Sequence, residues 1–370
     1  MADNKNLRNA NRAKQDEFYT QLVDIELEMK YYKDYFKNKI IFCNCDDPYE
    51  SNFFKYFAMN FNYLGLKKLI ATCYDNSPIA YTQINFFGDD KVVPNNNRHP
   101  YKIEITEVKD NNEDGAIDLS DVEYLLKNKK NTMSLLKGNG DFRSDECIEL
   151  LKQADIVVTN PPFSLFREYV AQLVEFHKDF IIIGNQNAIT YREIFPLIKN
   201  NKMFLGLSMN GSNRYFQVPN DYPLTESTGK IENGKKFAFV KSVVWFTSLD
   251  ISKFREDIVL YKQYSKSEYP SFENFNGINI DKVSDIPYDY NGYMGVPITF
   301  LHKYNPNQFE IIGLGISNSG IEIGVEPYKP EHKKYRKEVQ HKGAVDGDLY
   351  YLDENGHPQV PYARIIIRRK

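Results

Sequence analysis

Apolar runs and amphipathic segments alternate along the first half of the chain. Short apolar runs predict β-strands at residues 39–45, 67–74, 154–159 and 180–184. Apolar residues at helical spacing predict helices at residues 16–36, 50–60, 165–177 and 192–200. Since strands that alternate with helices form mostly parallel sheets covered on both faces, the pattern predicts a doubly wound, Rossmann-like α/β fold.

The alternation is interrupted twice. Residues 76–131 are rich in Asn, Asp and Lys, with one alternating piece at 101–108, which indicates an insertion or hairpin on the rim of the sheet. Beyond residue 201 the sequence is rich in Gly, Pro, Asn and Tyr, with β-like runs at 237–247 and 365–368. A chain of 370 residues has room for two domains. We therefore expect a flexible arm over 1–15, an α/β domain over 16–200 and an irregular α+β domain over 201–370.

Composition excludes a disordered chain and a uniformly basic one. Hydrophobic residues make up 42% of the sequence and aromatic residues 14%, which is enough to bury a core. The net charge of -3 gives no general attraction for phosphates, so any surface that binds nucleic acid must be local. Two basic clusters are present: Lys333, Lys334, Arg336 and Lys337, and Arg364, Arg368, Arg369 and Lys370. Taken alone, such clusters are more often solvated surface than phosphate sites.

Neither a membrane span nor a metal site is indicated. No stretch approaches the roughly 20 apolar residues of a membrane span, and the first residues are polar, so we expect a cytoplasmic protein. The four cysteines, Cys43, Cys45, Cys73 and Cys147, form no Cys-x-x-Cys pair. We therefore expect reduced thiols, with neither a disulfide nor a metal.

The segment Asn160-Pro161-Pro162-Phe163 carries the most chemical information. It follows a predicted buried strand and precedes a predicted helix, which places it at the carboxyl edge of the sheet, where ligands of open α/β sheets bind. The two prolines stiffen the loop, so the Asn160 amide oxygen and the Pro161 carbonyl form a fixed pair of acceptors. That pair suits the methylation of a conjugated amine, whose two protons it would accept, while Phe163 would stack on a flipped-out base. The alternative is a rigid turn without catalytic function.

Four further segments lie where this chemistry would need a cofactor site. The aromatic segment Phe18-Tyr19-Thr20 precedes the first strand and either covers a cofactor or packs in the core. Asn44, Cys45 and Asp46 lie at the end of that strand, where an acid either meets a cofactor's ammonium group or caps the next helix.

The other two segments follow the second strand and precede the third. Asp75 ends the second strand, where an acid can bind ribose hydroxyls. Asp141 and Phe142 lie in a loop after Gly140, where they either hold and stack on a cofactor's adenine or form an ordinary turn. The glycine- and tyrosine-rich segment 289–297 favours a packed turn over a loop against DNA.

Taken with these residues, the sequence resembles a known family. Asn160-Pro161-Pro162-Phe163 matches the catalytic motif of amino-group DNA methyltransferases. The segments DEFYTQ, FCNCDDP, SNFFKYF, GDFRS, DIVVTNPPFSLFREY, DYNGYMGVPITFLHK and NPNQFE are similar to the EcoRI-type adenine-specific DNA methyltransferases over nearly the whole chain. Residues 42–48 lack the glycine-rich loop of methyltransferases in general, a departure that the EcoRI-type family shares.

The resemblance implies a catalytic domain that binds S-adenosylmethionine and a C-terminal target recognition domain. It implies a monomer that methylates the exocyclic amino nitrogen of an adenine flipped out of a short site in double-stranded DNA. It also implies a type II restriction-modification system, in which the methylation protects DNA from a partner endonuclease.

Two rival functions remain open on the sequence. An RNA or protein-amide methyltransferase could use the same pair of acceptors on another planar nitrogen. A non-catalytic DNA-binding module could retain the fold without the reaction. A cytosine ring-carbon methyltransferase is disfavoured, because it needs a Pro-Cys nucleophile and none of the four cysteines follows a proline.

Overall fold

The computed structural model describes residues 20–45, 48, 51–73, 100–111, 113–127, 133–211, 213–218 and 222–370. The chain forms two compact units. The first comprises Met1–Gln186 and Leu205–Leu249, and the second comprises Asn187–Phe204 and Asp250–Lys370. This division differs from the boundary expected between residues 200 and 201, because two strands that follow residue 200 return to the sheet of the first unit.

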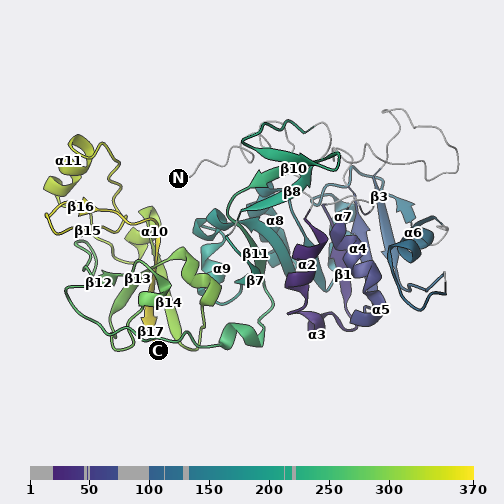
Figure 1. Ribbon diagram of the computed structural model, residues 1–370, viewed down its shortest axis with the longest axis horizontal. Helices are drawn as coiled ribbons and strands as arrows, with labels where there is room; N and C mark the ends of the chain where they lie inside the picture. Colours follow the sequence, from purple (N-terminus) through teal and green to yellow (C-terminus); the bar gives the residue numbers. More distant parts are fainter. Residues whose placement is uncertain are drawn as a thin grey trace. The chain divides into compact units, whose positions relative to one another are not determined.

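The first unit is built on an eight-stranded sheet in the order β4-β3-β2-β1-β5-β6-β11-β7 (Figure 1). The strands are β1 (Ile40–Cys43), β2 (Lys68–Thr72), β3 (Tyr101–Ile105), β4 (Met133–Leu135), β5 (Ile156–Thr159), β6 (Asp179–Asn185), β7 (Phe204–Asn210) and β11 (Val243–Thr247). The central strands β2, β1, β5 and β6 are parallel, whereas β3, β4 and β11 join antiparallel. The predicted α/β class is confirmed, with a sheet that is parallel at its centre and mixed at its sides.

The apolar runs form the centre of this sheet. Every residue of β5 is buried, and so are the last three residues of β1, as expected of strands covered on both faces. The helices of the first unit are α2 (Leu22–Met29), α3 (Lys33–Phe36), α4 (Asn52–Met59), α5 (Phe61–Leu64), α6 (Leu119–Lys127), α7 (Asp145–Gln153) and α8 (Phe166–Glu175).

Three local predictions for the first unit need correction. The predicted strand over 237–247 is two strands, because Ser242 takes a left-handed φ of 58° that breaks the extended backbone. The rim insertion over 76–131 contributes β3 to the main sheet, with Leu69 opposite Ile105, and β4 follows it just outside the expected bounds. Helix α7 was not predicted, although Ser144 caps its first turn by accepting a hydrogen bond from the Cys147 backbone N–H at 3.4 Å.

A second, three-stranded sheet belongs to the first unit. It consists of β8 (Arg214–Val218), β9 (Gly229–Glu232) and β10 (Lys235–Val240), in the order β8-β10-β9 with both pairings antiparallel. Its strands leave and re-enter the main sheet through β7, which precedes β8, and β11, which follows β10.

A buried carboxylate fastens α2 to the outermost strand of the main sheet. Glu28 is fully buried and accepts hydrogen bonds from the backbone N–H groups of Leu207 (3.0 Å) and Ser208 (2.7 Å) on β7. The Tyr32 hydroxyl donates to the same carboxylate at 2.9 Å. Burial, and then the negative charge of Glu28, raise the pKa of Tyr32 well above its usual range, so this hydroxyl remains a donor.

The second unit is an irregular α+β structure, as the sequence predicted. Its four-stranded sheet has the order β12-β13-β17-β14, and a two-stranded ribbon pairs β15 with β16. The strands are β12 (Gly277–Asn279), β13 (Tyr293–Pro297), β14 (Phe309–Gly315), β15 (Tyr351–Leu352), β16 (Pro358–Gln359) and β17 (Arg364–Arg369). The α-helices are α9 (Phe195–Lys199), α10 (Ser317–Glu322) and α11 (Pro330–Glu338), and short 3-10 turns such as η6 (Ile298–Lys303) lie between the strands.

The glycine-rich segment 289–297 packs inside this unit only at its carboxyl end, where Met294, Gly295 and Val296 are buried, whereas Asp289 and Asn291 are exposed. Its last five residues form β13, and a side chain at Gly295 would stand 2.7 Å from the Phe272 ring. The favoured packed turn is therefore right about the packing of these last residues, which form a strand instead of a turn.

Within the described residues, no helix has the length and apolar character needed to cross a membrane. The four cysteines are free thiols, of which Cys43, Cys73 and Cys147 are buried.

A buried histidine in the second unit should make the stability of the protein depend on pH. His302 in η6 is largely buried, with neither ring nitrogen hydrogen-bonded in the described part of the chain, and burial lowers its pKa to about 4. An unfolded histidine titrates near pH 6.5, so between pH 6.5 and about 4 the unfolded chain binds a proton that the folded chain does not. The free energy of unfolding should therefore fall as the pH drops through this window, by at most about 3 kcal/mol from this group.

Urea unfolding of His302→Gln between pH 7 and pH 4 measures this contribution. The variant should lose part of the pH slope that the wild type shows, whereas His341→Gln, on the surface of the same unit, should keep it. Equal slopes for wild type and His302→Gln would contradict the assignment.

Candidate active site

The carboxyl ends of the four parallel strands bring the predicted site segments to one edge of the main sheet. Asn44 follows β1, Cys73 follows β2 and Asn160 follows β5, while Asn185 is the last residue of β6. The register places Ile41 beside Ile156 and Thr159 beside Ile182, so these ends are neighbours across the sheet. This is the edge at which open α/β sheets bind ligands.

The loop Asn160-Pro161-Pro162-Phe163 has the predicted setting between a buried strand and a helix. Asn160 is 3% exposed and Pro161 is buried, whereas Pro162 and Phe163 are half-buried. Phe163 begins the 3-10 turn η2 (Phe163–Leu165), whose Leu165 N–H donates to the Pro162 carbonyl at 3.0 Å, and α8 follows at once. The loop therefore has a fixed path, with an aromatic ring at its more exposed end.

Asn44 ties the end of β1 to the end of β5 and to α8. The Thr159 hydroxyl donates to the Asn44 backbone carbonyl, and the Tyr169 hydroxyl donates to the Asn44 side-chain oxygen. All three residues are buried, and Thr159 directly precedes Asn160. The predicted cofactor segment at Asn44 and the predicted catalytic loop are thus joined by two hydrogen bonds.

Sequence reasoning did not select Thr159 or Tyr169. A signal for Tyr169 exists: α8 buries Phe166, Tyr169, Val170 and Leu173, and a buried tyrosine hydroxyl generally needs a partner. Burial raises the pKa of Tyr169 well above its usual range, so the hydroxyl stays protonated and donates to Asn44.

The loop Gly140-Asp141-Phe142 lies against the end of β2. Gly140 has a left-handed φ of 76°, and a Cβ there would stand 2.1 Å from the Cys73 carbonyl oxygen, so only glycine fits. The Phe142 ring meets the Tyr169 ring edge-on at a centroid distance of 5.1 Å. Gln172 on α8 donates to the Phe142 carbonyl at 3.1 Å. The loop is therefore held between β2 and α8, beside the Asn44 contacts.

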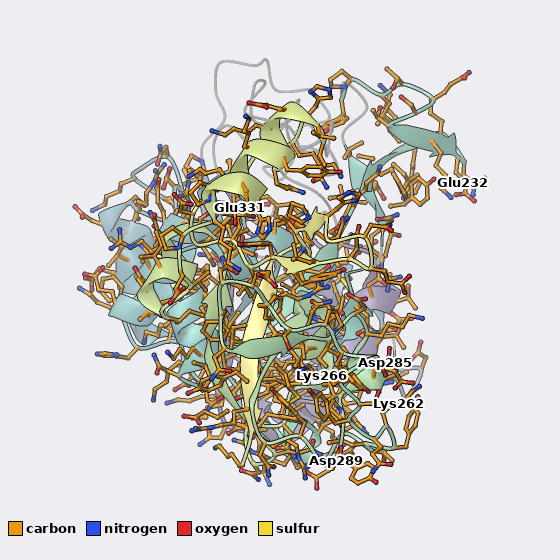
Figure 2. The ribbon with its side chains drawn as sticks, turned by 90° about the vertical axis from the view of Figure 1, so that its left-hand side faces the viewer. Glu232, Lys262, Lys266, Asp285, Asp289 and Glu331 are labelled. Atoms are coloured by element: carbon orange, nitrogen blue, oxygen red, sulfur yellow. The ribbon has the colours of Figure 1, made fainter. Side chains whose placement is uncertain are left out.

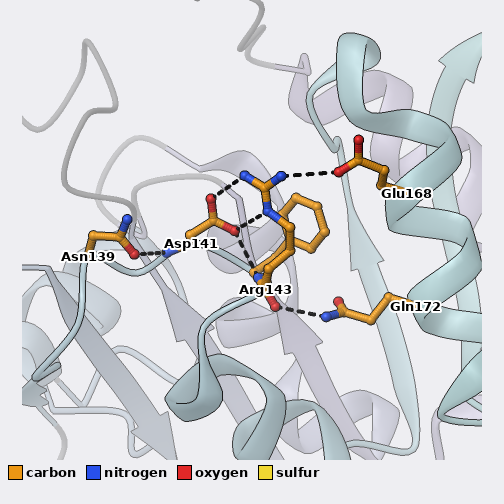
Figure 3. Close-up of polar contacts among 6 residues, drawn as sticks. Asn139, Asp141, Arg143, Glu168 and Gln172 are labelled. Carbon is orange, nitrogen blue, oxygen red and sulfur yellow. Dashed lines mark hydrogen bonds and ion pairs between the residues drawn. The ribbon is translucent and has the colours of Figure 1, made fainter.

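The Asp141 carboxylate accepts several hydrogen bonds from Arg143 (Figure 3). Arg143 donates to it from the backbone N–H (2.8 Å), from Nε (2.9 Å) and from Nη2 (2.7 Å). The Arg143 guanidinium also contacts Glu168 on α8 at 3.1 Å. Hydrogen bonding by Arg143 lowers the pKa of Asp141, so this group is a carboxylate at neutral pH. A carboxylate has about four acceptor sites, so the three donors found among the described residues leave it one further lone pair for a ligand.

The remaining predicted cofactor residues are only partly described. Thr20 is 1% exposed, and its carbonyl accepts a hydrogen bond from the Asn52 amide at 2.7 Å. Its buried hydroxyl has no hydrogen-bond partner among the residues the structure describes. Cys45 is half-buried with a left-handed φ of 75°. Phe18, Tyr19, Asp46 and Asp75 lie outside the described residues.

The two predicted basic clusters lie in the second unit, where some of their members form ion pairs. Lys333 contacts Asp346 at 2.8 Å, and Arg368 contacts Glu310 at 2.7 Å. Arg336 is buried and donates to the Gly343 carbonyl at 3.0 Å. Elsewhere on this unit, Lys262 and Lys266 lie in the same region as Asp285 and Asp289 (Figure 2). The surface charge of this unit is therefore mixed.

Known proteins resemble this chain along its full length. A family model described as "Adenine-specific methyltransferase EcoRI" matches residues 6–370. The type II methyltransferase M.EcoRI of Escherichia coli is 43% identical over 372 residues, which cover 100% of this chain and 98% of that protein. The type II methyltransferase M.MgeORF184P of Mycoplasma genitalium is 39% identical over 309 residues, which cover 82% of this chain and 84% of that protein.

A solved structure also aligns, although less closely. A putative RNA methyltransferase from Pyrococcus horikoshii aligns over 65% of this chain and 90% of its own with 13% identity and a TM-score of 0.27, which is too low to establish a shared fold. The family match instead covers both compact units and includes the loop at Asn160. The chain belongs to the EcoRI-type adenine-specific methyltransferase family.

Proposed function

We propose that this enzyme transfers the methyl group of S-adenosylmethionine to the exocyclic amino nitrogen of an adenine in a short site of double-stranded DNA. The observation that carries the proposal is the full-length family match together with an Asn-Pro-Pro-Phe loop at the carboxyl edge of the parallel strands. The relatives bear the name type II methyltransferase, which supports a role as the modification enzyme of a restriction-modification system with a partner endonuclease.

The loop supplies the geometry that the reaction needs. The lone pair of an adenine amino group is delocalised into the ring, so the nitrogen is a poor nucleophile. The Asn160 side-chain oxygen and the Pro161 carbonyl would accept hydrogen bonds from its two N–H groups, which returns electron density to the nitrogen and orients it. S-adenosylmethionine would supply a methyl group made electrophilic by its sulfonium sulfur and would leave as S-adenosylhomocysteine. The methylated nitrogen would then release one proton to solvent. Both protein acceptors belong to a proline-stiffened loop, so little reorganisation accompanies the reaction.

Phe163 provides a surface for the flipped base. Its ring is half-buried at the start of η2, next to the acceptor pair in sequence. A base leaves the duplex only if the loss of stacking is offset in the pocket. We assign that compensation to Phe163.

The surroundings of Asn44 fit the cofactor. A polar ligand end needs buried hydrogen-bonding groups, and Thr20 offers a buried hydroxyl without a partner in the described part of the chain. Asn44 and Cys45 lie at the end of β1, while Phe142 and the remaining lone pair of Asp141 lie at the end of β2. We assign the polar amino acid end of the cofactor to Thr20, Asn44 and Cys45, together with Phe18, Tyr19 and Asp46 from the sequence. We assign its ribose to Asp75, also from the sequence, and its adenine to Asp141 and Phe142.

We propose a different role for each of the two units. The first unit acts as a doubly wound methyltransferase domain, which differs from the sequence-based domain 16–200 by losing residues 187–200 and gaining 205–249. The second unit acts in target recognition. We also propose that the enzyme works as a cytoplasmic monomer.

Replacing Asn160 tests the acceptor pair. Asn160→Ala should lower turnover on DNA by on the order of a hundredfold or more, because an oriented polar group is lost from the reacting centre. Calorimetric titration should show that S-adenosylmethionine still binds. The assay measures transfer of tritiated methyl groups to duplex DNA, tRNA and protein in parallel. Near-normal turnover in the variant, or label in tRNA or protein with none in DNA, contradicts the proposal.

Replacing Phe163 tests the stacking surface. Phe163→Ala should weaken the flipped-base complex by about 1 to 3 kcal/mol, the usual worth of stacking between a base and an aromatic ring. A duplex with 2-aminopurine at the target position reports flipping as a rise in fluorescence. The rise should be smaller in the variant at equal occupancy, and an identical rise would remove Phe163 from this role.

Replacing Tyr169 tests the link between the cofactor segment and the catalytic loop. Tyr169→Phe leaves the buried Asn44 side-chain oxygen without this donor, a cost of about 1 to 3 kcal/mol. Because Asn44 lies in the proposed cofactor site, the Kd for S-adenosylmethionine should rise. Tyr32→Phe is the matched control, since it removes a buried hydroxyl bonded to Glu28 instead. Both variants should lose stability, and an unchanged Kd in Tyr169→Phe would contradict the link.

A further inference from the structure

The three-stranded sheet β8-β10-β9 extends from the carboxyl edge of the main sheet. Val243, the first residue of β11, lies opposite Asn185 at the carboxyl end of β6, and β10 ends only three residues earlier. The Gln186 N–H donates to the Ser242 carbonyl at 2.7 Å. β6 neighbours β5, which leads into Asn160, so this small sheet starts one strand away from the proposed catalytic loop.

The connection from β7 into β8 also lies close to the carboxyl edge of the main sheet. β7 leads into β8 through residues 211–213, and a Cβ at Gly211 would stand 2.1 Å from the Gln186 side-chain oxygen. Gly211 also has a left-handed φ of 68°. Both ends of the small sheet are therefore anchored around Gln186, on the edge that carries Asn160.

One face of this sheet gathers aromatic rings and a lysine, and we refer to Tyr215, Gln217, Lys230, Phe237 and Phe239 as its outer face. The register pairs Tyr215 with Phe239, and it pairs Phe237 with both Gln217 and Lys230, so these side chains share one side. The Tyr215 and Phe239 rings are 5.1 Å apart. The Lys230 ammonium stands 4.9 Å from the Tyr215 ring centre and 5.7 Å from that of Phe237.

The side chains that this small sheet buries lie on its opposite face. Phe216, Val218, Ala238 and Val240 alternate with the outer-face residues and are buried. Tyr215 is 42% exposed on the outer face. Phe237 and Phe239 are half-buried, and Lys230 is exposed. An exposed tyrosine ring and an ammonium group therefore lie side by side on this face, a combination found in grooves that bind single-stranded nucleic acid.

The charge of the segment points to an anionic partner. Residues 214–241 contain five basic and three acidic residues, a net charge of +2 in a chain whose net charge is -3. Lys230 does pair with Glu232 at 2.6 Å, but both side chains are about half exposed, so that pair is weak. Figure 2 shows Glu232 at the outer end of this sheet. In the basic clusters of the second unit, Lys333 and Arg368 form comparable, partly exposed pairs with Asp346 and Glu310.

We propose that the outer face of the β8-β10-β9 sheet binds the DNA strand beside the target adenine. This inference rests on the proposed function. The Lys230 ammonium contacts a phosphate, and the rings of Tyr215 and Phe237 stack on a base or sugar left exposed where the duplex is opened. Stacking tolerates any base, so this surface holds distorted DNA without reading its sequence.

The test compares Lys230→Gln and Tyr215→Leu with a matched pair on the other edge of the sheet. Tyr63 and Lys33 form the same kind of contact, with the ammonium 3.8 Å from the ring centre. Tyr63 lies on α5, just before β2 begins, and therefore at the amino edge. Lys33→Gln and Tyr63→Leu serve as controls.

The measurements are the Kd for a duplex of unmethylated DNA at several salt concentrations and the Kd for S-adenosylmethionine. The duplex carries the site found by single-molecule sequencing of DNA from cells that express the enzyme. Lys230→Gln should reduce the salt slope by about one, as loss of one phosphate contact does. Tyr215→Leu should raise the Kd for DNA by on the order of tenfold, as loss of one stacked ring does. The Kd for S-adenosylmethionine and the salt slope of both controls should not change.

The outcomes separate this inference from the proposed function. Unchanged DNA affinity and salt slope in Lys230→Gln, whose substitution removes only an exposed charge, would overturn the inference while methyl transfer by the wild type continues. A wild-type enzyme that methylates no DNA would instead overturn the proposed function. If Tyr215→Leu unfolds, circular dichroism reveals it, and the Lys230→Gln result decides alone.

Discussion

The geometry of the site depends on the hydrogen bonds that converge on Asn44. Three separate elements meet there: the end of β1 supplies Asn44, the end of β5 supplies Thr159 and α8 supplies Tyr169. A buried amide oxygen or hydroxyl that loses its partner is costly, so none of these elements moves alone. The loop at Asn160 begins one residue after Thr159. The position of the proposed acceptor pair is thus fixed relative to the proposed cofactor segment by contacts that the chemistry itself does not use.

Local sequence signals predicted the parts of this arrangement that local forces determine. The apolar runs of β1, β2, β5 and β6 and the proline pair after β5 are properties of neighbouring residues, and they located the carboxyl edge and the loop that we propose to be catalytic. The contacts of Thr159 and Tyr169 were not predicted, because they depend on which strands become neighbours. The loop at Gly140 was predictable only in part. Its sequence indicated a turn, but the close fit of Gly140 against the Cys73 carbonyl follows only from the fold.

The boundary between the two units was missed for the same reason. β11 pairs with β6, with Val243 opposite Asn185, across more than fifty residues of chain that include a separate sheet. Nothing in the composition of residues 201–249 marks them as part of an α/β sheet. The basic clusters were interpreted as surface more often than as phosphate sites, and the ion pairs of Lys333 and Arg368 with acids elsewhere in the unit could not be predicted from the sequence.

The buried Glu28 has a consequence beyond fastening a helix. A strand at the border of a sheet normally displays N–H groups on which another extended chain can form hydrogen bonds, and such borders promote edge-to-edge association. β7 is such a border strand, and the Glu28 carboxylate already occupies the N–H groups of Leu207 and Ser208. An incoming chain would have to displace a fully buried negative charge. The largest sheet of the molecule is thereby protected, on this side, against growth into aggregates.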